Sequence, residues 1–277
     1  MKPIAAVTAL AASAMLTACG GLVRSRIYHP PTARLSPAGL GPDVREIGVA
    51  TADGLALRGL ERPPSGDMPV LLFFHGNASS ASGVMAWLRP LLDRGYGFVS
   101  AEYRGYSGNP GSPTQAGLTR DADAFHAHAR RLAGSRPLIV VGHSLGGGVA
   151  FDLALRHRFD ALVTIGTFAS IRDVAPRIAR AFIPDPFDNR AAVAKIDEPL
   201  FLIHGDRDDV ISLWHARELQ EAAAAAKRDG AAIVLSGEGH QPDAAVVAAA
   251  IDAIRGSAGD LRKLAVALPK GARVVPF

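Results

Sequence analysis

Short apolar runs along the chain alternate with longer segments of mixed polarity, and this pattern predicts strands and helices in turn. Continuous apolar runs are typical of strands covered on both faces. The runs lie at 69–75, 97–103, 137–143, 161–166, 199–205 and 231–237, with helical patterns at 83–94, 114–132, 145–157, 212–227 and 242–254. Strands that alternate with helices predict an α/β fold, with a mostly parallel sheet flanked by helices on both faces.

Four segments lie outside this regular alternation. Two strands joined by a turn at 52–54 are expected between residues 45 and 61. Residues 167–198 carry short helical patterns and are too long for a plain connection, so a small cap over the site is expected there. The proline-containing stretch 19–42 is expected to be a tether, and 257–277 a tail without a clear pattern. The main domain is thus expected over 43–256.

The first nineteen residues, MKPIAAVTALAASAMLTAC, combine an early Lys, a short apolar run and small residues. This order predicts a secretory signal at 1–18, and the run is too short for a good membrane span. Leu16-Thr17-Ala18-Cys19 resembles the bacterial lipobox. The resemblance implies that Cys19 is acylated and begins the mature chain, and Gly20 after it implies sorting to the outer membrane of a Gram-negative bacterium. The alternative is an ordinary cleaved signal with an incidental cysteine.

Composition narrows the remaining possibilities. The chain has 277 residues and is 48% hydrophobic, which suits one large core. Its net charge is +4 without a dense basic cluster, so nucleic-acid binding is not predicted. Cys19 is the only cysteine, which excludes an intramolecular disulfide. The glycines at 146–148 lack the Lys of a phosphate loop, and we predict no nucleotide or metal cofactor.

The segment VVGHSLGGG at 140–148 places Ser144 between Gly142 and Gly146, where a predicted strand meets a helix. G-x-S-x-G in this context predicts a nucleophile elbow, in which a tight turn strains the serine backbone. Side chains at 142 and 146 would collide with the neighbouring strand and helix. The turn would direct the Leu145 N–H at developing negative charge. The alternative is a glycine-rich helix start with an inert serine, and His143 is expected to pack or line the site.

A serine nucleophile needs a base, and the base needs an orienting acid. In folds with this elbow the chain order is Ser, acid, His. His240 follows the last predicted strand and precedes the last predicted helix, at the sheet edge expected for Ser144, and is the predicted base. The preceding strand leads into HGDRDDVI, which offers three carboxylates. We predict that Asp208 is the acid, with Asp206 as the alternative, and that Asp209 caps the next helix.

The loop after 69–75, HGNASS, is the predicted source of the second oxyanion donor. The Asn77 N–H is expected to act together with that of Leu145, although a polar strand end would explain the same residues. His204 falls inside a predicted strand and is expected to be packed. Arg104 could hold a substrate anion or form a structural ion pair.

Residues from about 44 to 254 resemble α/β-hydrolase fold serine hydrolases. The matching segments are TADGLALRGL, LLFFHGNASS, YRGYSGNPGSPT, VGHSLGGGVA, FDNRAAVAKIDEPLFLIHGDRDDVI and GEGHQP. The resemblance is to the short-cap group, which includes lysophospholipase-like and depalmitoylating thioesterase members. It implies a nucleophile at Ser144, an acid at Asp208, a base at His240, and oxyanion groups at Asn77 and Leu145. Ser107 and Asn109 depart from the family's loop, which weakens any inference about substrate.

These observations predict a monomeric hydrolase of small acyl esters or thioesters, bound to the membrane through a lipid on Cys19. A serine aminopeptidase-like enzyme shares the elbow but usually carries a larger cap. A non-catalytic surface lipoprotein that uses the fold for binding is the alternative of another class, because a fold does not determine a function.

Overall fold

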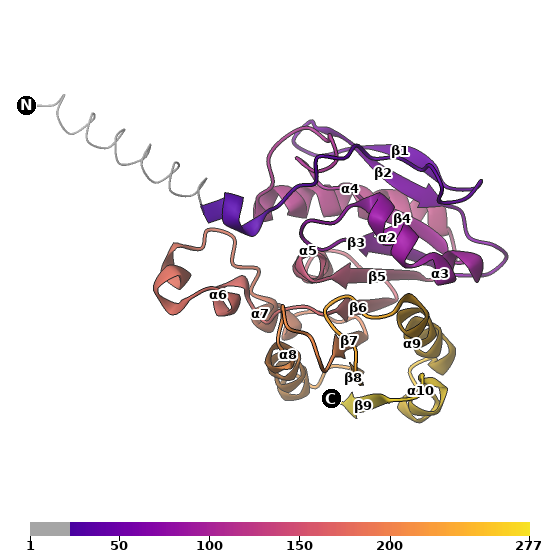
Figure 1. The fold of residues 1–277 in the computed structure, drawn as a ribbon. Coiled ribbons are helices and arrows are strands. Elements are labelled where there is room, and N and C mark those ends of the chain that lie inside the picture. The colour runs from indigo at the N-terminus through magenta and orange to yellow at the C-terminus, as the bar shows by residue number, and fades with distance from the viewer. Residues whose placement is uncertain (1–22) are drawn as a thin grey trace, which may run out of the picture.

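The computed structural model describes residues 23–277, which form one mixed sheet covered by helices on both faces (Figure 1). The strand order is β1-β2-β4-β3-β5-β6-β7-β8-β9. The strands are β1 (Arg45–Ala50), β2 (Ala56–Arg62), β3 (Val70–Phe74), β4 (Gly97–Ala101), β5 (Leu138–His143), β6 (Ala161–Ile165), β7 (Leu200–Gly205), β8 (Gly230–Leu235) and β9 (Ala272–Pro276). Strands β4, β3, β5, β6, β7 and β8 run parallel, whereas β1, β2 and β9 join antiparallel at the edges.

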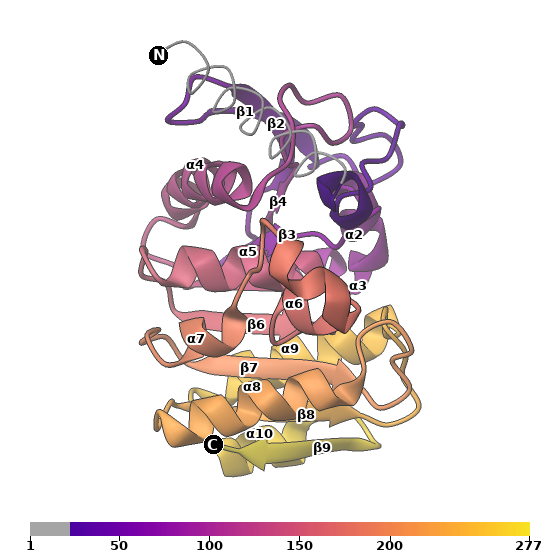
Figure 2. The same ribbon diagram turned by 90° about the vertical axis from the view of Figure 1, so that its left-hand side faces the viewer.

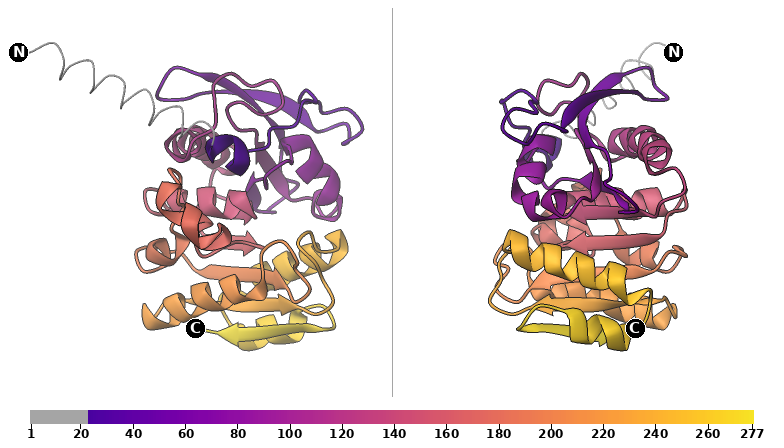
Figure 3. Two further views of the ribbon diagram at one scale, coloured as in Figure 1. Left: turned by 60° about the vertical axis from the view of Figure 1, so that its left-hand side comes forward. Right: turned by 90° about the vertical axis from the view of Figure 1, so that its right-hand side faces the viewer.

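Two apolar layers sandwich the sheet. Alternate residues of β3 point to opposite faces: Leu72 packs in the layer of α4 (Gln115–Ala133), α5 (Leu145–Ala154) and α8 (Leu213–Ala225). Leu71 packs in the layer of α2 (Ala81–Trp87), α3 (Arg89–Asp93), α9 (Ala244–Ser257) and α10 (Leu261–Ala267). Figure 3 shows that helices cover both faces of the sheet. The predicted α/β fold with a mostly parallel central sheet is therefore confirmed.

The single helix predicted at 83–94 is two short helices instead. Helix α2 ends at Trp87 and α3 begins at Arg89, with Pro90 in its first turn. Proline has no N–H to donate and clashes with the preceding turn, so a helix restarts at it rather than continuing through it.

The segment expected as a tether packs on the domain from Val23 onward. Tyr28 is buried in one apolar layer, and Leu35 and Leu40 are buried in the other. This packing could not be predicted from the sequence, because single apolar residues can fill grooves in the domain surface without forming a periodic pattern. The predicted signal and Cys19 lie outside the described residues. Within residues 23–277, no helix combines the length and the apolarity that crossing a membrane requires.

The C-terminal residues expected to be a patternless tail are largely ordered. Helix α10 covers the sheet, and β9 pairs antiparallel with β8, so that Val274 lies opposite Ile233. The register places the apolar residues of β9 against an already buried strand, which explains why this short segment is held.

The segment expected as a cap, 167–198, forms α6 (Ile171–Val174), the 3₁₀-helix η1 (Arg177–Phe182) and α7 (Asn189–Val193). Figure 2 shows α6 in front of the edge of the sheet at which β5, β6 and β7 end. In parallel sheets ligands bind at this edge, so the cap stands over the expected site.

Candidate active site

Ser144 occupies the tight turn between β5 and α5. Its φ is +52°, a left-handed conformation that is unusual and costly for a residue with a side chain. A Cβ at Gly146 would overlap the Phe74 carbonyl of β3, and one at Gly142 would overlap the backbone at Gly146. The collisions predicted from the sequence are thus present in the fold, and the Ser144 N–H is tied to the Ile165 carbonyl at 2.9 Å.

Asp208 and His240 form a hydrogen-bonded pair at the same edge. His240 Nδ1 lies 2.9 Å from Asp208 Oδ2, and the carboxylate is fully buried. The other oxygen, Oδ1, accepts the N–H groups of Val210 and Ile211 at 3.0 and 2.8 Å. Burial alone would raise the pKa of Asp208, but hydrogen bonds from His204, His240 and the Ile211 N–H outweigh it. The net pKa lies well below its usual range, so Asp208 stays ionised.

The other two carboxylates of this loop, Asp206 and Asp209, do not contact His240. Asp206 is exposed, and its Oδ1 accepts the Gly237 N–H at 2.7 Å, which ties the β7 loop to the β8 loop. Asp209 is exposed, and the residue at the start of α8 is Ser212, which makes no side-chain cap. The prediction that Asp209 caps this helix is therefore wrong, because Asp209 stands three residues before Ser212, which occupies the cap position.

Two further histidines pack around the pair. His204 is buried, with Nε2 2.7 Å from the Ile211 carbonyl and 3.3 Å from Asp208 Oδ2. His143 Nε2 donates to the His240 carbonyl at 2.9 Å, and its ring centroid lies 5.2 Å from that of Trp87 and 4.9 Å from that of His240. Burial and the neighbouring His240 lower the pKa of His143 to about 4. His143 is therefore neutral near pH 7 and supports the His240 loop without adding charge.

Ser144 and His240 meet at one cavity. Both line a space of about 230 Å³, together with Gly76, Asn77 and His143. Among residues 23–277, no hydrogen bond joins the Ser144 hydroxyl to the His240 ring. Such bonds are often long in unliganded enzymes and tighten when substrate binds, so the shared cavity is the informative observation.

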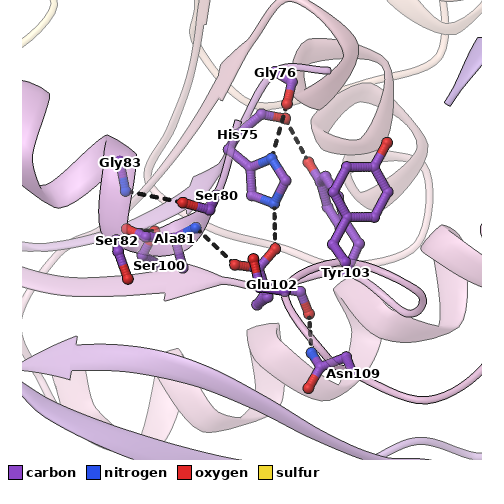
Figure 4. A network of polar contacts seen from close by, with 12 residues as sticks. His75, Gly76, Ser80, Ala81, Ser82, Gly83, Ser100, Glu102, Tyr103 and Asn109 are labelled. Carbon is purple, nitrogen blue, oxygen red and sulfur yellow. Dashed lines mark hydrogen bonds and ion pairs between the residues drawn. The ribbon is translucent and has the colours of Figure 1, made fainter. Parts of the chain in front are cut away.

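A buried network of hydrogen bonds around His75 and Glu102 precedes the loop that carries Asn77, as Figure 4 shows. His75 Nδ1 donates to the Gly76 carbonyl at 2.8 Å, and its Nε2 lies 2.9 Å from Glu102 Oε1. The Tyr103 hydroxyl donates to the His75 carbonyl, and the Ala81 N–H donates to Glu102. These contacts hold the backbone that leads into Asn77 in one place. Glu102 was not predicted from the sequence, because it follows the end of β4 and comes 27 residues after His75 along the chain.

The Asn77 side chain is occupied elsewhere. Its amide donates to the Ile27 carbonyl at 2.6 Å, and its oxygen accepts the His29 N–H and the Tyr106 hydroxyl. Within the described chain, no hydrogen bond is donated by the main-chain N–H of Asn77 or of Leu145. The main-chain groups, rather than the Asn77 amide, thus remain available for a ligand in the cavity.

A second, larger cavity of about 610 Å³ is also lined by Ser144. Its walls come from the elbow, from the cap and from the N-terminal segment. The apolar lining includes Val23, Ile27, Leu145, Phe168, Ile171, Ala179, Ile183 and Ile211. Sequence reasoning missed the contribution of residues 23–27, because nothing in that proline-rich stretch indicates a contact with a site more than a hundred residues away.

Comparisons with known proteins agree with this architecture. The sequence profile described as alpha/beta hydrolase fold matches residues 69–185. A Mycobacterium tuberculosis protein described as uncharacterized is 31% identical over 264 residues, covering 91% of this chain and 93% of that protein. The chain belongs to the α/β-hydrolase fold family.

Relatives of this α/β hydrolase include enzymes of stated activity. Lysophosphatidylserine lipase ABHD12 of Xenopus tropicalis is 31% identical over 201 residues, which cover 64% of this chain and 52% of the lipase. Among solved structures, the Pyrococcus furiosus esterase Pf2001 superposes with a TM-score of 0.64 at 19% identity. That match covers 86% of this chain and 97% of the esterase, and at this identity it supports the fold alone.

Arg104 of this α/β hydrolase is a structural residue. Its guanidinium contacts Asp53 at 2.7 and 3.0 Å and Asp121 at 2.7 and 2.8 Å. It is 6% exposed, so its charge is fully paired inside the protein. Of the two roles left open by the sequence, the ion pair is the one observed.

Among the described residues no group of three His, Cys, Asp or Glu side chains could hold a metal ion.

Gly166, at the end of β6, makes room for the Asp208–His240 pair and was not singled out from the sequence. Its φ is +57°, and a Cβ there would lie 3.2 Å from Asp208 Oδ2 and from His240 Nδ1. A signal was available, because a glycine at the carboxyl end of a buried parallel strand lies at the ligand-binding edge.

We expect Gly166→Ala to lower hydrolytic activity on the order of tenfold to a hundredfold, because it displaces the carboxylate–imidazole pair. Gly54→Ala is the matched control: its φ is +84°, but no heavy atom lies within 4 Å of the added Cβ. Both variants carry the strain of a left-handed alanine. Thermal melts should show similar losses, while steady-state kinetics separates them. Equal activity of the two variants would contradict the role given to Gly166.

Proposed function

We propose that this α/β hydrolase cleaves carboxylic esters or thioesters of apolar acyl groups through an acyl-enzyme on Ser144. The observation that carries the proposal is the buried Asp208–His240 pair beside the strained Ser144 turn, at a shared cavity. A carboxylate that orients an imidazole toward a serine hydroxyl is the arrangement that activates serine for acyl transfer.

The reaction follows from these positions. His240 accepts the hydroxyl proton while Ser144 Oγ bonds to the substrate carbonyl carbon, and Asp208 stabilises the imidazolium. The carbonyl oxygen becomes an oxyanion, for which the N–H groups of Asn77 and Leu145 are the donors. Collapse breaks the ester or thioester bond, and His240 protonates the departing alcohol or thiol. Water then attacks the acyl-enzyme with the same proton transfers and releases the acid.

The large cavity favours an acyl group over a peptide. Its described lining is almost wholly apolar, with Arg26, Asn77 and Ser144 as the polar members, and contains no carboxylate. An aminopeptidase needs acidic groups to bind the substrate amine. An apolar cavity beside the nucleophile instead suits a hydrocarbon chain.

A fluorophosphonate probe tests the chemistry directly, since it reacts with activated serines. Labelling of the native protein, mapped by mass spectrometry of its peptides, is expected at Ser144. A folded protein that remains unlabelled would favour the alternative of a binding module without catalysis.

We also propose that Cys19 is acylated and anchors the protein at the outer membrane. Support comes from the Leu-Thr-Ala-Cys sequence after a short apolar run. In a bacterial host, a palmitate analogue should be incorporated into the protein, and Cys19→Ser should lose that label. Incorporation that survives the substitution would contradict the anchor.

A further inference from the structure

The cap exposes an unusual number of large apolar side chains. Val174, Ile178 and Phe182 are 47%, 88% and 73% exposed, and Val210 from the β7 loop is 60% exposed. Val174 and Val210 also line the large cavity, together with Ala179 of η1. We call Val174, Ile178, Phe182 and Val210 the apolar rim: two of them line the cavity, and Ile178 and Phe182 lie on η1 beside Ala179, which also lines it. Contiguous exposed apolar groups mark interaction surfaces in soluble domains.

Basic side chains accompany the rim. Arg26, Arg172 and Arg177 are exposed, and none has an ion-pair partner within residues 23–277. The nearby carboxylates are engaged by other arginines: Asp173 by Arg180 and Arg190, and Asp185 by Arg24. Asp209, next to Val210, is an exposed carboxylate at this end. The surface therefore combines apolar groups with an excess of positive charge.

The first described residue lies at this same surface. Val23 lines the cavity, and Cys19 precedes it by four residues. Four residues span at most about 14 Å, whatever their conformation. A lipid on Cys19 would therefore hold the bilayer within that distance of the cavity wall.

We propose that the apolar rim docks on an anionic lipid bilayer. The three arginines beside the rim would contact the headgroups, and the cavity entrance would face the acyl chains. Apolar side chains bury in the interface while arginines interact with anionic headgroups. This binding requires no turnover, so it stands or fails separately from the proposed hydrolysis.

A site-specific fluorophore tests the contact in the full chain. In the Cys19→Ser background, the second substitution Phe182→Cys supplies the only thiol, which is labelled with an environment-sensitive dye. We expect its emission to shift to the blue when phosphatidylglycerol vesicles are added, and to shift much less with phosphatidylcholine. The control is Val266→Cys, because Val266 is 89% exposed on α10, on the opposite side of the molecule from α6 (Figure 1). Its dye should not respond.

Vesicle sedimentation supplies an independent measurement. Ile178→Ser with Phe182→Ser should weaken binding at least about tenfold relative to the Cys19→Ser parent, whereas Val266→Ser should not change it. An equal response of the two dyes, no response at position 182, or unchanged sedimentation would overturn the proposal. A shift at 182 that depends on protein concentration without vesicles would instead identify a second copy of this chain as the occupant.

Discussion

Ser144→Ala is expected to abolish fluorophosphonate labelling and to lower kcat/KM for ester hydrolysis on the order of 10⁴- to 10⁶-fold. The substitution removes the oxygen that would form the acyl-enzyme, while the imidazole, the carboxylate and the oxyanion donors remain. Alanine keeps the strained φ of +52° without a larger side chain, so the fold should be retained. Kinetics with p-nitrophenyl esters of increasing chain length would measure the loss.

Ser79→Ala is a suitable comparison, since Ser79 lines the same small cavity without standing in the elbow. We expect this variant to keep most of its activity and all of its labelling. Substantial hydrolysis by a folded Ser144→Ala protein would show that another group is the nucleophile.

Asp208→Asn should lower kcat by about 10⁴-fold, the cost of the same change in a well-studied serine protease. The structure supplies the reason. Oδ1 is fixed by the N–H groups of Val210 and Ile211, so an asparagine would direct its NH₂ group at His240 Nδ1. His240 would then accept at Nδ1 and carry its proton on Nε2, where it could not take the proton of Ser144.

The carboxylates on either side of Asp208 provide matched controls for this result. Asp206→Asn removes a charge that contacts the Gly237 N–H, and Asp209→Asn removes an exposed charge. Both variants should retain activity within a few-fold of the native protein. The low pKa of Asp208 adds that its carboxylate stays charged as the pH falls through the mildly acidic range. A loss of activity at mildly acidic pH would therefore not come from protonation of Asp208. A larger loss in Asp206→Asn than in Asp208→Asn would show that Asp206 is the acid.

The elements that the sequence predicted best are those with a local cause. The parallel strands are continuous apolar runs, and the elbow needs glycine at 142 and 146 because backbone lies against both positions. The choice of Asp208 over Asp206 also followed from local geometry, since the residue three positions past the end of a strand turns back toward the next loop. The structure places Asp208, not Asp206, on His240.

Contacts between distant segments were not predictable in the same way. The docking of residues 23–29 on Asn77 depends on backbone groups of an irregular segment, which leave no trace in residue type. From the sequence, Glu102 is only a polar residue at the end of a strand, and its contact with His75 depends on the fold. The pairing of β9 with β8 depends on register rather than on any strong pattern in the last residues.

The two edge strands of the sheet, β1 and β9, affect whether this protein aggregates at high local concentration. An outer strand offers unpaired backbone groups to a neighbouring molecule, and charges, prolines and short length discourage such pairing. β1 presents Arg45 and Glu46, and β9 is a short strand that carries Arg273 and ends at Pro276. Molecules confined together in two dimensions would therefore resist joining their sheets into a continuous aggregate.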